Sequence, residues 1–288
     1  MTCRRALDVA RISAAILAAV CLCSLADCGG RLATRPGEFE VARQKVTMAK
    51  RDLAATYVKP EAPRRPERLV VFCTGDAGWM GVSGMVFERL AELGYHVAGY
   101  DAREMLKPVK ESGKRVGISK TASWLDELFQ QARKDLGLRE TTPIIFVGYS
   151  CGASGAVLAT LSQRLRPEIA GTIAIALTRE SDYLRAPDPA DRPPEIQVDE
   201  KERIQLYPAI ALAGETPVAV IQSAGDSYVP AAEARKLLGP DTATRRLYEV
   251  EAKNHRFSGG RDALVRDLED ALQWIEKTAG DPGPSPAP

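Results

Sequence analysis

A serine held between two glycines is the residue of this chain whose setting best suits covalent chemistry. Residues 148–152 read Gly-Tyr-Ser-Cys-Gly and fit the pattern G-x-S-x-G, with Ser150 at its centre. In this pattern a buried strand ends, the backbone turns sharply at the serine and a helix begins. Glycines leave room for the strained turn, which lifts the hydroxyl group clear of the sheet. Ser150 is therefore the candidate nucleophile.

A nucleophilic serine needs a general base, and the chain has two histidines. His96 lies inside an apolar segment that is typical of a strand, which indicates a structural role. His255 follows the expected strand 246–250, in a loop where ligands bind in open α/β sheets. His255 is therefore the candidate base.

The base in turn needs an acid that orients it. Asp226 follows the expected strand 217–222 and lies between the serine and the histidine in the chain. The order Ser150, Asp226, His255 is the order of triads in α/β-hydrolases. Asp182 is the alternative candidate for the acid.

Hydrolysis through a serine also requires N–H donors for the oxyanion that forms during attack. The N–H of Cys151 is one candidate, because it begins the helix after the serine. The second is expected from the glycine-rich turn 74–79, through the N–H of Asp76 or Ala77. Three side chains near these loops are expected to bind substrate: Trp79, Tyr149 and Asp182.

The elements that must position these residues alternate along the chain. Six apolar segments have the composition of buried strands, and amphipathic segments follow most of them. This alternation predicts an α/β fold with a mostly parallel sheet and helices on both faces. The expected strands are 68–73, 95–100, 144–147, 169–177, 217–222 and 246–250. The expected helices are 82–93, 119–136, 151–165, 231–238 and 262–277.

The long segment 178–214 has no clear periodicity, and we expect it to cover the site as a short cap. Its part 180–202 holds eight acidic and three basic residues, a formal charge of −5 in a chain of net charge +1. A negative wall would concentrate a cationic substrate. A solvated loop whose acids only aid solubility is the alternative.

The first 27 residues have the features of a secretory signal peptide. Basic residues precede the uncharged apolar run 12–26, which is too short to span a bilayer comfortably. Residues 25–28 resemble a bacterial lipobox, so Cys28 is a candidate for lipidation and membrane association. Cleavage after 24–26 and an uncleaved anchor are the alternatives. We expect a periplasmic or envelope-anchored bacterial protein.

The rest of the chain divides into three parts by composition. Residues 28–67 are expected to be a tether and peripheral segment, in which 39–57 forms either a hairpin or a helix. The catalytic domain is expected at 68–277. The tail 278–288 is rich in Pro and Gly and is expected to be disordered.

Composition excludes several other classes of protein. The 288 residues are 45% hydrophobic and 27% charged, and no basic run of the kind that binds nucleic acid is present. No CxxC pair suggests zinc, and we expect neither a metal nor a cofactor. Cys73 and Cys151 are expected to be near neighbours at one edge of the sheet, with a disulfide between them left open.

The whole pattern over 68–277 resembles the α/β-hydrolase fold. A narrower resemblance rests on Thr-Gly-Asp-Ala-Gly-Trp at 74–79, on Gly148–Ala153, on Thr-Arg-Glu-Ser-Asp-Tyr at 178–183 and on the His255 loop. These stretches resemble the VirJ/AcvB family of bacterial virulence proteins, although Ala77 replaces a glycine of that family. The resemblance implies a periplasmic protein that hydrolyses aminoacylated phosphatidylglycerol, chiefly its lysyl form.

Together these features predict an exported serine hydrolase that acts on a carboxylic ester, with a small-molecule or lipid substrate. An acyltransferase with the same triad is one alternative. A non-catalytic hydrolase-like binding protein of the envelope is another, although a pure binder has no need of serine, histidine and aspartate together.

Overall fold

The computed structural model describes residues 39–48, 50–64, 66–188, 192 and 196–280. The expected signal peptide, the lipobox with Cys28 and the end of the tail lie outside the described residues. None of the described helices combines the length and the apolar character needed to cross a membrane.

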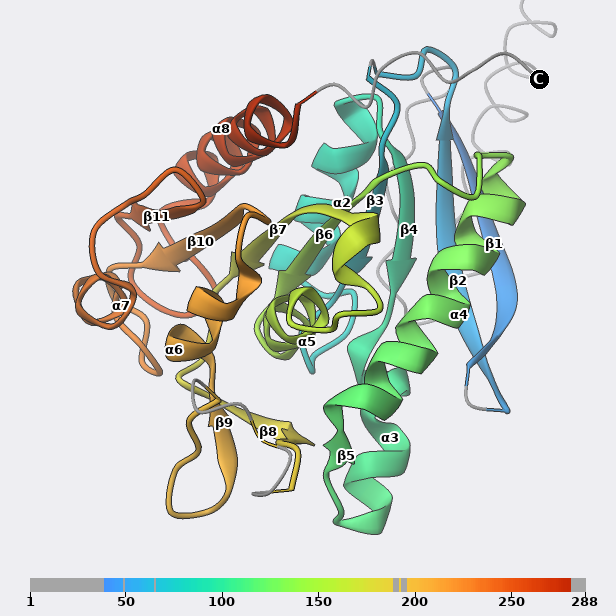
Figure 1. Ribbon diagram of the computed structural model, residues 1–288. Helices are drawn as coiled ribbons and strands as arrows, with labels where there is room; N and C mark the ends of the chain where they lie inside the picture. Colours follow the sequence, from blue (N-terminus) through green and yellow to red (C-terminus); the bar gives the residue numbers. More distant parts are fainter. Residues whose placement is uncertain (1–38, 49, 65, 189–191, 193–195, 281–288) are drawn as a thin grey trace, which may run out of the picture. The chain divides into compact units, whose positions relative to one another are not determined.

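An eight-stranded sheet forms the centre of the described chain, in the order β1-β2-β4-β3-β6-β7-β10-β11 (Figure 1). The six strands from β4 to β11 in this order are parallel to one another. All six strands predicted from the sequence are confirmed: β3 (Leu69–Cys73), β4 (His96–Tyr100), β6 (Ile144–Tyr149), β7 (Ile169–Ile175), β10 (Val218–Ser223) and β11 (Arg245–Val250).

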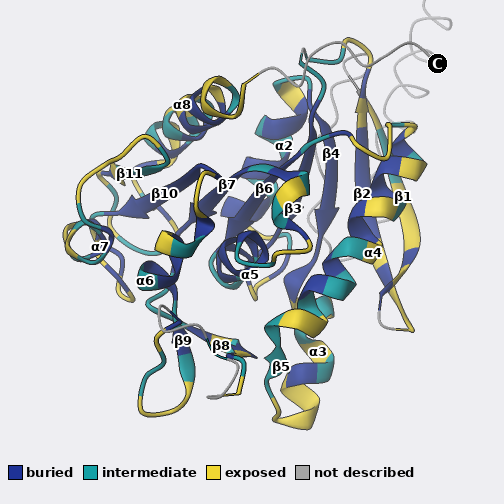
Figure 2. Cartoon of the chain, in the orientation of Figure 1, coloured by how far each residue is buried: buried dark blue, intermediate teal, exposed yellow. Residues whose placement is uncertain are grey.

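Both faces of the sheet are buried, which accounts for the uninterrupted apolar character of its strands. Successive side chains of a strand point to opposite faces. Val70 and Phe72 therefore join the core beneath α2 (Val82–Glu92) and α8 (Arg261–Ala279). Leu69 and Val71 join the core beneath α4 (Ile118–Leu136). The predicted α/β class with helices on both faces is confirmed, and the helices expose only their outer sides (Figure 2).

Two further helices cover the face of the sheet on which α4 lies. α5 (Cys151–Thr160) packs on β6 and β7 and is apolar nearly all round, as expected of a helix enclosed by others. α7 (Ala231–Leu238) buries Ala234 and Leu238 in the same apolar cluster as residues of α5. These helices follow the strands that carry the candidate residues, so their packing fixes where those residues lie.

The segment 28–67 contributes more to the fold than the sequence indicated. Of the two forms considered for 39–57, the structure has the hairpin, β1 (Phe39–Met48) and β2 (Arg51–Pro60). This part is the peripheral structure and not the tether, since β2 pairs antiparallel with β4 and extends the central sheet. Alternate residues of β2, such as Leu53, Ala55 and Tyr57, are buried against α4, so the sheet begins about thirty residues before the predicted domain boundary at residue 68.

The segment 178–214 is also more regular than predicted. It contains β8 (Glu180–Arg185), β9 (Arg203–Gln205), α6 (Leu206–Ile210) and a 3-10 turn at Ala211–Ala213. β8 pairs with β9 and with β5 (Val116–Gly117) in a separate three-stranded sheet. This small sheet is the predicted cap insertion. Its strands are too short and too polar to give a clear pattern in sequence.

The helix α3 (Ala102–Ser112) was not predicted, because Pro108 interrupts it and few of its residues are apolar. The Asp101 side chain accepts the N–H of Arg103 at 2.9 Å and caps its start. Gly113 ends it in the left-handed conformation. α3 therefore leads directly from the end of β4 towards the cap.

Candidate active site

Ser150 occupies a sharp turn between β6 and α5. Its φ of 55° and ψ of −118° are strained for a residue with a side chain. A Cβ on Gly148 would lie 2.2 Å from the carbonyl oxygen of Gly152, and a Cβ on Gly75 would lie 2.9 Å from the ring of Tyr149. A Cβ on Gly152 would likewise lie 2.3 Å from the carbonyl oxygen of Cys73. Both glycines of the G-x-S-x-G pattern therefore face backbone atoms, and only glycine fits at these two positions.

The structure brings Ser150, His255 and Asp226 into one chain of hydrogen bonds. The Nε2 of His255 lies 3.0 Å from the Oγ of Ser150. The Nδ1 of His255 lies 2.8 Å from the Oδ2 of Asp226. The imidazole can therefore take a proton from the serine while the carboxylate faces its other nitrogen.

Asp226 is buried and held by several donors. It lies just beyond the end of β10, and its Oδ1 accepts the N–H of Tyr228 at 2.8 Å. Its Oδ2 accepts the side-chain amide of Gln222 at 3.0 Å. The amide of Gln222 also donates to the carbonyl of Val229, which fixes the orientation of the amide. These contacts hold the carboxylate, which is 1% exposed, in one position facing His255.

His255 lies in the loop between β11 and α8, as predicted. The hydroxyl of Tyr149 donates to the carbonyl oxygen of His255 at 3.1 Å. The ring of Tyr228 lies edge-on to the imidazole, with ring centres 4.8 Å apart. These two tyrosines limit the positions that the imidazole can take.

The loop expected to complete the oxyanion site is a tight turn after β3. The N–H of Gly78 donates to the carbonyl of Gly75 at 3.0 Å and closes the turn. Asp76 and Ala77 form its exposed tip and line the same pocket as Ser150. Cys151 is the first residue of α5 and lines that pocket as well. The three residues predicted to supply N–H groups therefore surround the serine.

The pocket above Ser150 has a volume of about 530 Å³ and a mostly polar wall. Three carboxylates, of Asp76, Glu180 and Asp182, and one guanidinium, of Arg256, are among its lining groups. The lining residues are Asp76, Ala77, Tyr149, Ser150, Cys151, Ser154, Thr178, Glu180, Asp182, Tyr183, Ser227, Tyr228, Asn254, His255 and Arg256. The cap thus supplies one side of the pocket and the sheet loops supply the other.

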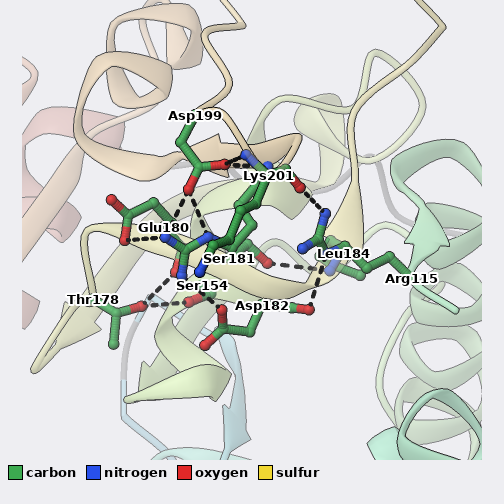
Figure 3. A network of polar contacts seen from close by, with 10 residues as sticks. Arg115, Ser154, Thr178, Glu180, Ser181, Asp182, Leu184, Asp199 and Lys201 are labelled. Carbon is green, nitrogen blue, oxygen red and sulfur yellow. Dashed lines mark hydrogen bonds and ion pairs between the residues drawn. The ribbon is translucent and has the colours of Figure 1, made fainter. Parts of the chain in front are cut away.

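Arg203 holds much of the acidic charge of the cap. Its guanidinium forms ion pairs with Asp199 at 2.6 Å, Asp182 at 3.1 Å and Glu180 at 3.7 Å. Arg115 donates to the carbonyls of Asp182 and Lys201 and joins the network from outside the cap (Figure 3). Arg203 lies one residue beyond the segment whose charge was counted as −5, so part of that excess is neutralised within the cap.

Cys73 and Cys151 are free thiols that line one small apolar cavity of about 60 Å³ beside the pocket. The predicted neighbourhood is therefore found, without the disulfide. Burial raises the pKa of the Cys151 thiol to about 12, and the charge of Asp76 acts in the same direction. Burial also raises the pKa of Cys73 well above its ordinary value. Neither thiol is a thiolate at neutral pH.

Two predicted substrate contacts, Tyr149 and Asp182, line the pocket, and the third does not. The ring of Trp79 packs edge-on against Phe87, with ring centres 5.1 Å apart, and also against Phe72. Trp79 is thus part of the core beneath α2 and is absent from the described lining of the pocket. The sequence placed it beside the oxyanion turn but gave no sign of the direction of its side chain.

Asp182, the alternative candidate for the acid, forms an ion pair with Arg203. The carboxylate that contacts His255 is that of Asp226. His96 is buried within β4. Several pocket residues were not singled out from the sequence: Glu180, Tyr183, Tyr228, Asn254 and Arg256, with Gln222 behind Asp226. Of these residues, only Tyr228 could have been suggested by the sequence, because it follows the candidate acid Asp226 by two residues.

Among the described residues, no group of His, Cys, Asp and Glu side chains could hold a metal ion. The polar groups that line the pocket include the hydroxyl of Ser150, the imidazole of His255 and three carboxylates. This set suits acyl transfer to and from a serine.

Comparison with known proteins places this geometry in context. Residues 67–186 match the family model described as bacterial virulence protein (VirJ). No curated protein sequence matches the chain significantly. Among solved structures, a candidate dienelactone hydrolase of Klebsiella pneumoniae has 17% identity and a TM-score of 0.58, over 82% of this chain and 98% of that one.

Two further solved structures are similar over most of this chain. Est1E of Butyrivibrio proteoclasticus has 17% identity and a TM-score of 0.54, over 81% of this chain and 98% of that one. The acylaminoacyl peptidase of Pyrococcus horikoshii has 14% identity and a TM-score of 0.55, over 84% of this chain and 42% of that one. At such identities the likeness establishes the fold.

Proposed function

Because the chain has the α/β-hydrolase fold and its residues 67–186 match the VirJ family model, we propose that it is an exported serine hydrolase that cleaves a carboxylic ester. The observation that carries the proposal is the hydrogen-bonded chain from Ser150 through His255 to Asp226. A strained serine at a helix start has little structural use. In a hydrolase the same strain presents the nucleophile.

In the first half of the proposed reaction, the Oγ of Ser150 attacks the ester carbonyl carbon while its proton passes to the Nε2 of His255. The buried carboxylate of Asp226 stabilises the imidazolium that results. The carbonyl oxygen becomes an oxyanion, which accepts hydrogen bonds from the backbone N–H of Cys151 and from that of Asp76 or Ala77.

The tetrahedral intermediate then collapses, and the leaving alcohol takes the proton from His255. The acyl group remains on Ser150 as an ester. In the second half, His255 removes a proton from a water molecule, which attacks the acyl carbon. The bond from that carbon to the Oγ of Ser150 then breaks, His255 returns the proton to the Oγ, and the acid leaves. An alcohol in place of water would make the protein an acyltransferase, and product analysis with added alcohols distinguishes the two.

For the substrate we propose an acyl group that carries an ammonium, as in aminoacyl esters of phosphatidylglycerol. Support comes from the three carboxylates of the pocket wall, since a one-signed wall concentrates ligands of the opposite charge. Arg203 pairs with two of them, Glu180 and Asp182, but forms no such pair with Asp76 among the described residues. We therefore propose that Asp76 pairs with whichever ammonium group of the substrate lies nearest to Ser150.

Export is part of the proposal and rests on the first residues of the sequence. Basic residues, an apolar run and the lipobox-like residues 25–28 fit a secretory signal. Mass analysis of the mature N-terminus tests this part. A lipidated Cys28 or a chain that begins after residue 26 supports export, and an intact Met1 in the cytoplasmic fraction contradicts it.

The nucleophile is tested with a fluorophosphonate probe on the full chain. We expect one labelled site, Ser150, and loss of both labelling and ester turnover in Ser150→Ala. Ser154→Ala is the matched control, because Ser154 lines the same pocket and should leave Ser150 labelled. Equal turnover by the wild type and Ser150→Ala across a broad ester panel would refute the proposal.

The charge preference is tested by comparing kcat/KM for lysyl, alanyl and uncharged acyl esters at low and high salt. We expect the lysyl ester to be preferred at low salt and the preference to shrink at high salt. Asp76→Asn should reduce the lysyl preference by about tenfold and leave uncharged esters nearly unaffected. A preference for uncharged esters at low salt would contradict the proposed cationic substrate, and a general carboxylesterase would then be the function that remains.

A further inference from the structure

A second hollow of about 840 Å³ lies away from Ser150, between the turn of the β1–β2 hairpin, α3 and the start of α4. We call it the basic groove. Figure 1 shows α3 beside the start of α4, and α4 packs against the β1–β2 hairpin. Its lining residues are Thr47, Met48, Lys50, Arg51, Leu53, Glu104, Met105, Pro108, Val109, Ser112, Lys114, Arg115, Val116, Gly117, Lys120, Trp124 and Glu127.

The rim of the basic groove is positive. Five of its described lining residues are basic and two are acidic, a net of +3 in a chain whose total is +1. Arg115 donates hydrogen bonds to two backbone carbonyls. These acceptors are neutral, so they do not cancel its positive charge. The start of α4 at Gly117 adds the partial positive charge of a helix N-terminus. The exposed cations are Lys50, Arg51, Lys114 and Lys120.

The floor of the basic groove is apolar. Met48, Leu53 and Val109 are buried beneath it, and the half-buried Met105, Val116 and Trp124 contribute the rest. A soluble anion would need only the rim. A ligand that uses both surfaces has an anionic head and an apolar part joined to it.

The basic groove is linked to the surroundings of the candidate active site through two of its lining residues. Met105 lines the groove and also the small apolar cavity next to Cys151. Arg115 lines the groove and donates to the carbonyl of Asp182, at 3.3 Å, in the pocket wall. A surface bound at the groove would therefore lie close to the mouth of the pocket.

We propose that the basic groove binds an anionic phospholipid presented by a bilayer. The phosphate lies against the basic rim, and the beginning of an acyl chain covers the apolar floor. Clustered Lys and Arg side chains attract anionic leaflets with a free energy that falls as salt rises. The site is distinct from Ser150, so binding does not depend on the proposed hydrolase reaction.

The test measures binding of the full chain to vesicles of phosphatidylcholine alone and of phosphatidylcholine mixed with phosphatidylglycerol, by co-sedimentation. A Ser150→Ala background prevents turnover. We expect binding to the mixed vesicles that weakens at high salt. The double variant Lys114→Glu/Lys120→Glu should weaken it by about tenfold or more.

Lys236→Glu/Lys277→Glu is the matched control, since it makes the same change of charge at exposed lysines of α7 and α8. We expect it to bind the mixed vesicles like the parent. An equal loss in both double variants would overturn the proposal, because net charge alone would then account for binding. Equal binding to neutral vesicles, or tight binding of inorganic phosphate without vesicle binding, would overturn it too.

Trp124 reports the position of the lipid. It is one of three tryptophans in the chain, and it lines the groove floor. Vesicles of phosphatidylglycerol brominated on the acyl chains should quench part of the tryptophan fluorescence of the parent. That part should be absent in Trp124→Phe, whereas undiminished quenching in Trp124→Phe would place the bilayer elsewhere.

Discussion

A Cβ on Gly152 would lie 2.3 Å from the carbonyl oxygen of Cys73. The first turn of α5 therefore touches the end of the neighbouring strand β3, backbone against backbone. This approach holds the serine turn next to the turn that begins at Gly75. The two candidate oxyanion loops can therefore lie this close together only because residue 152 has no side chain.

We predict that Gly152→Ala lowers the free energy of unfolding by about 3 kcal/mol, because neither backbone can move freely. Gly155→Ala is the control in the same helix, since its Cβ would meet no atom within 4 Å. It should raise the free energy of unfolding by about 0.5–1 kcal/mol. Urea denaturation of both variants measures this, and similar values for the two would contradict the steric argument.

Asp226→Asn keeps the shape of the site but removes the charge that faces His255. We expect kcat for ester hydrolysis to fall by about 10⁴, with little change in KM, because the amide favours the wrong tautomer of the imidazole. Gln222→Met should lower kcat by about tenfold through the loss of one bond to the same carboxylate oxygen. A variant Asp226→Asn with near-normal kcat would remove Asp226 from the proposed triad.

The six parallel strands could be predicted from sequence because both faces of the sheet are buried. A short, continuous apolar run such as 144–147 is typical of a strand enclosed on both sides. For 39–57 the sequence left a hairpin and a helix open, because the hairpin β1–β2 lies at the edge of the sheet and β1 exposes many polar side chains. The cap strands β8 and β9 depend on the bonds of Arg203 and Arg115, which periodicity does not report.

The residues of the candidate site were predictable where function constrains the backbone. Ser150 lies between two glycines that the turn requires, and Asp226 and His255 follow strand ends. Trp79 was placed in the pocket wrongly, because the direction of a side chain after a turn depends on its packing against Phe72 and Phe87. Gln222 was missed because it lies within β10 and acts through Asp226.

The two buried thiols predict how stability depends on pH. Their ordinary pKa is 9.0, and burial raises both values in the folded protein. Above pH 9 the unfolded chain releases these protons while the folded chain keeps them, so stability falls as pH rises. The slope approaches about 1.4 kcal/mol per pH unit for each thiol as the unfolded thiol becomes fully ionised.

Urea denaturation between pH 9 and pH 10 measures this effect by difference. The buried tyrosines, whose ordinary pKa is 10.0, contribute equally in the wild type and in a variant without the two thiols. We expect the variant Cys73→Ala/Cys151→Ala to lose stability more slowly than the wild type over this interval. Its stability at pH 7 serves as the reference for any packing change. Parallel curves for the two proteins would show that the thiols titrate alike in both states.

Arg203 allows a last prediction, about the cap. It pairs with three carboxylates at once, and its own side chain is 26% exposed. Arg203→Gln leaves these acids facing one another, so we expect a loss of about 1–2 kcal/mol in the free energy of unfolding, smaller at high salt. Arg185→Gln breaks the exposed pair with Asp188 in the same cap and should cost less than about 0.5 kcal/mol. Thermal denaturation at two salt concentrations compares the variants, and an equal cost for both would mean that the network adds nothing beyond single surface pairs.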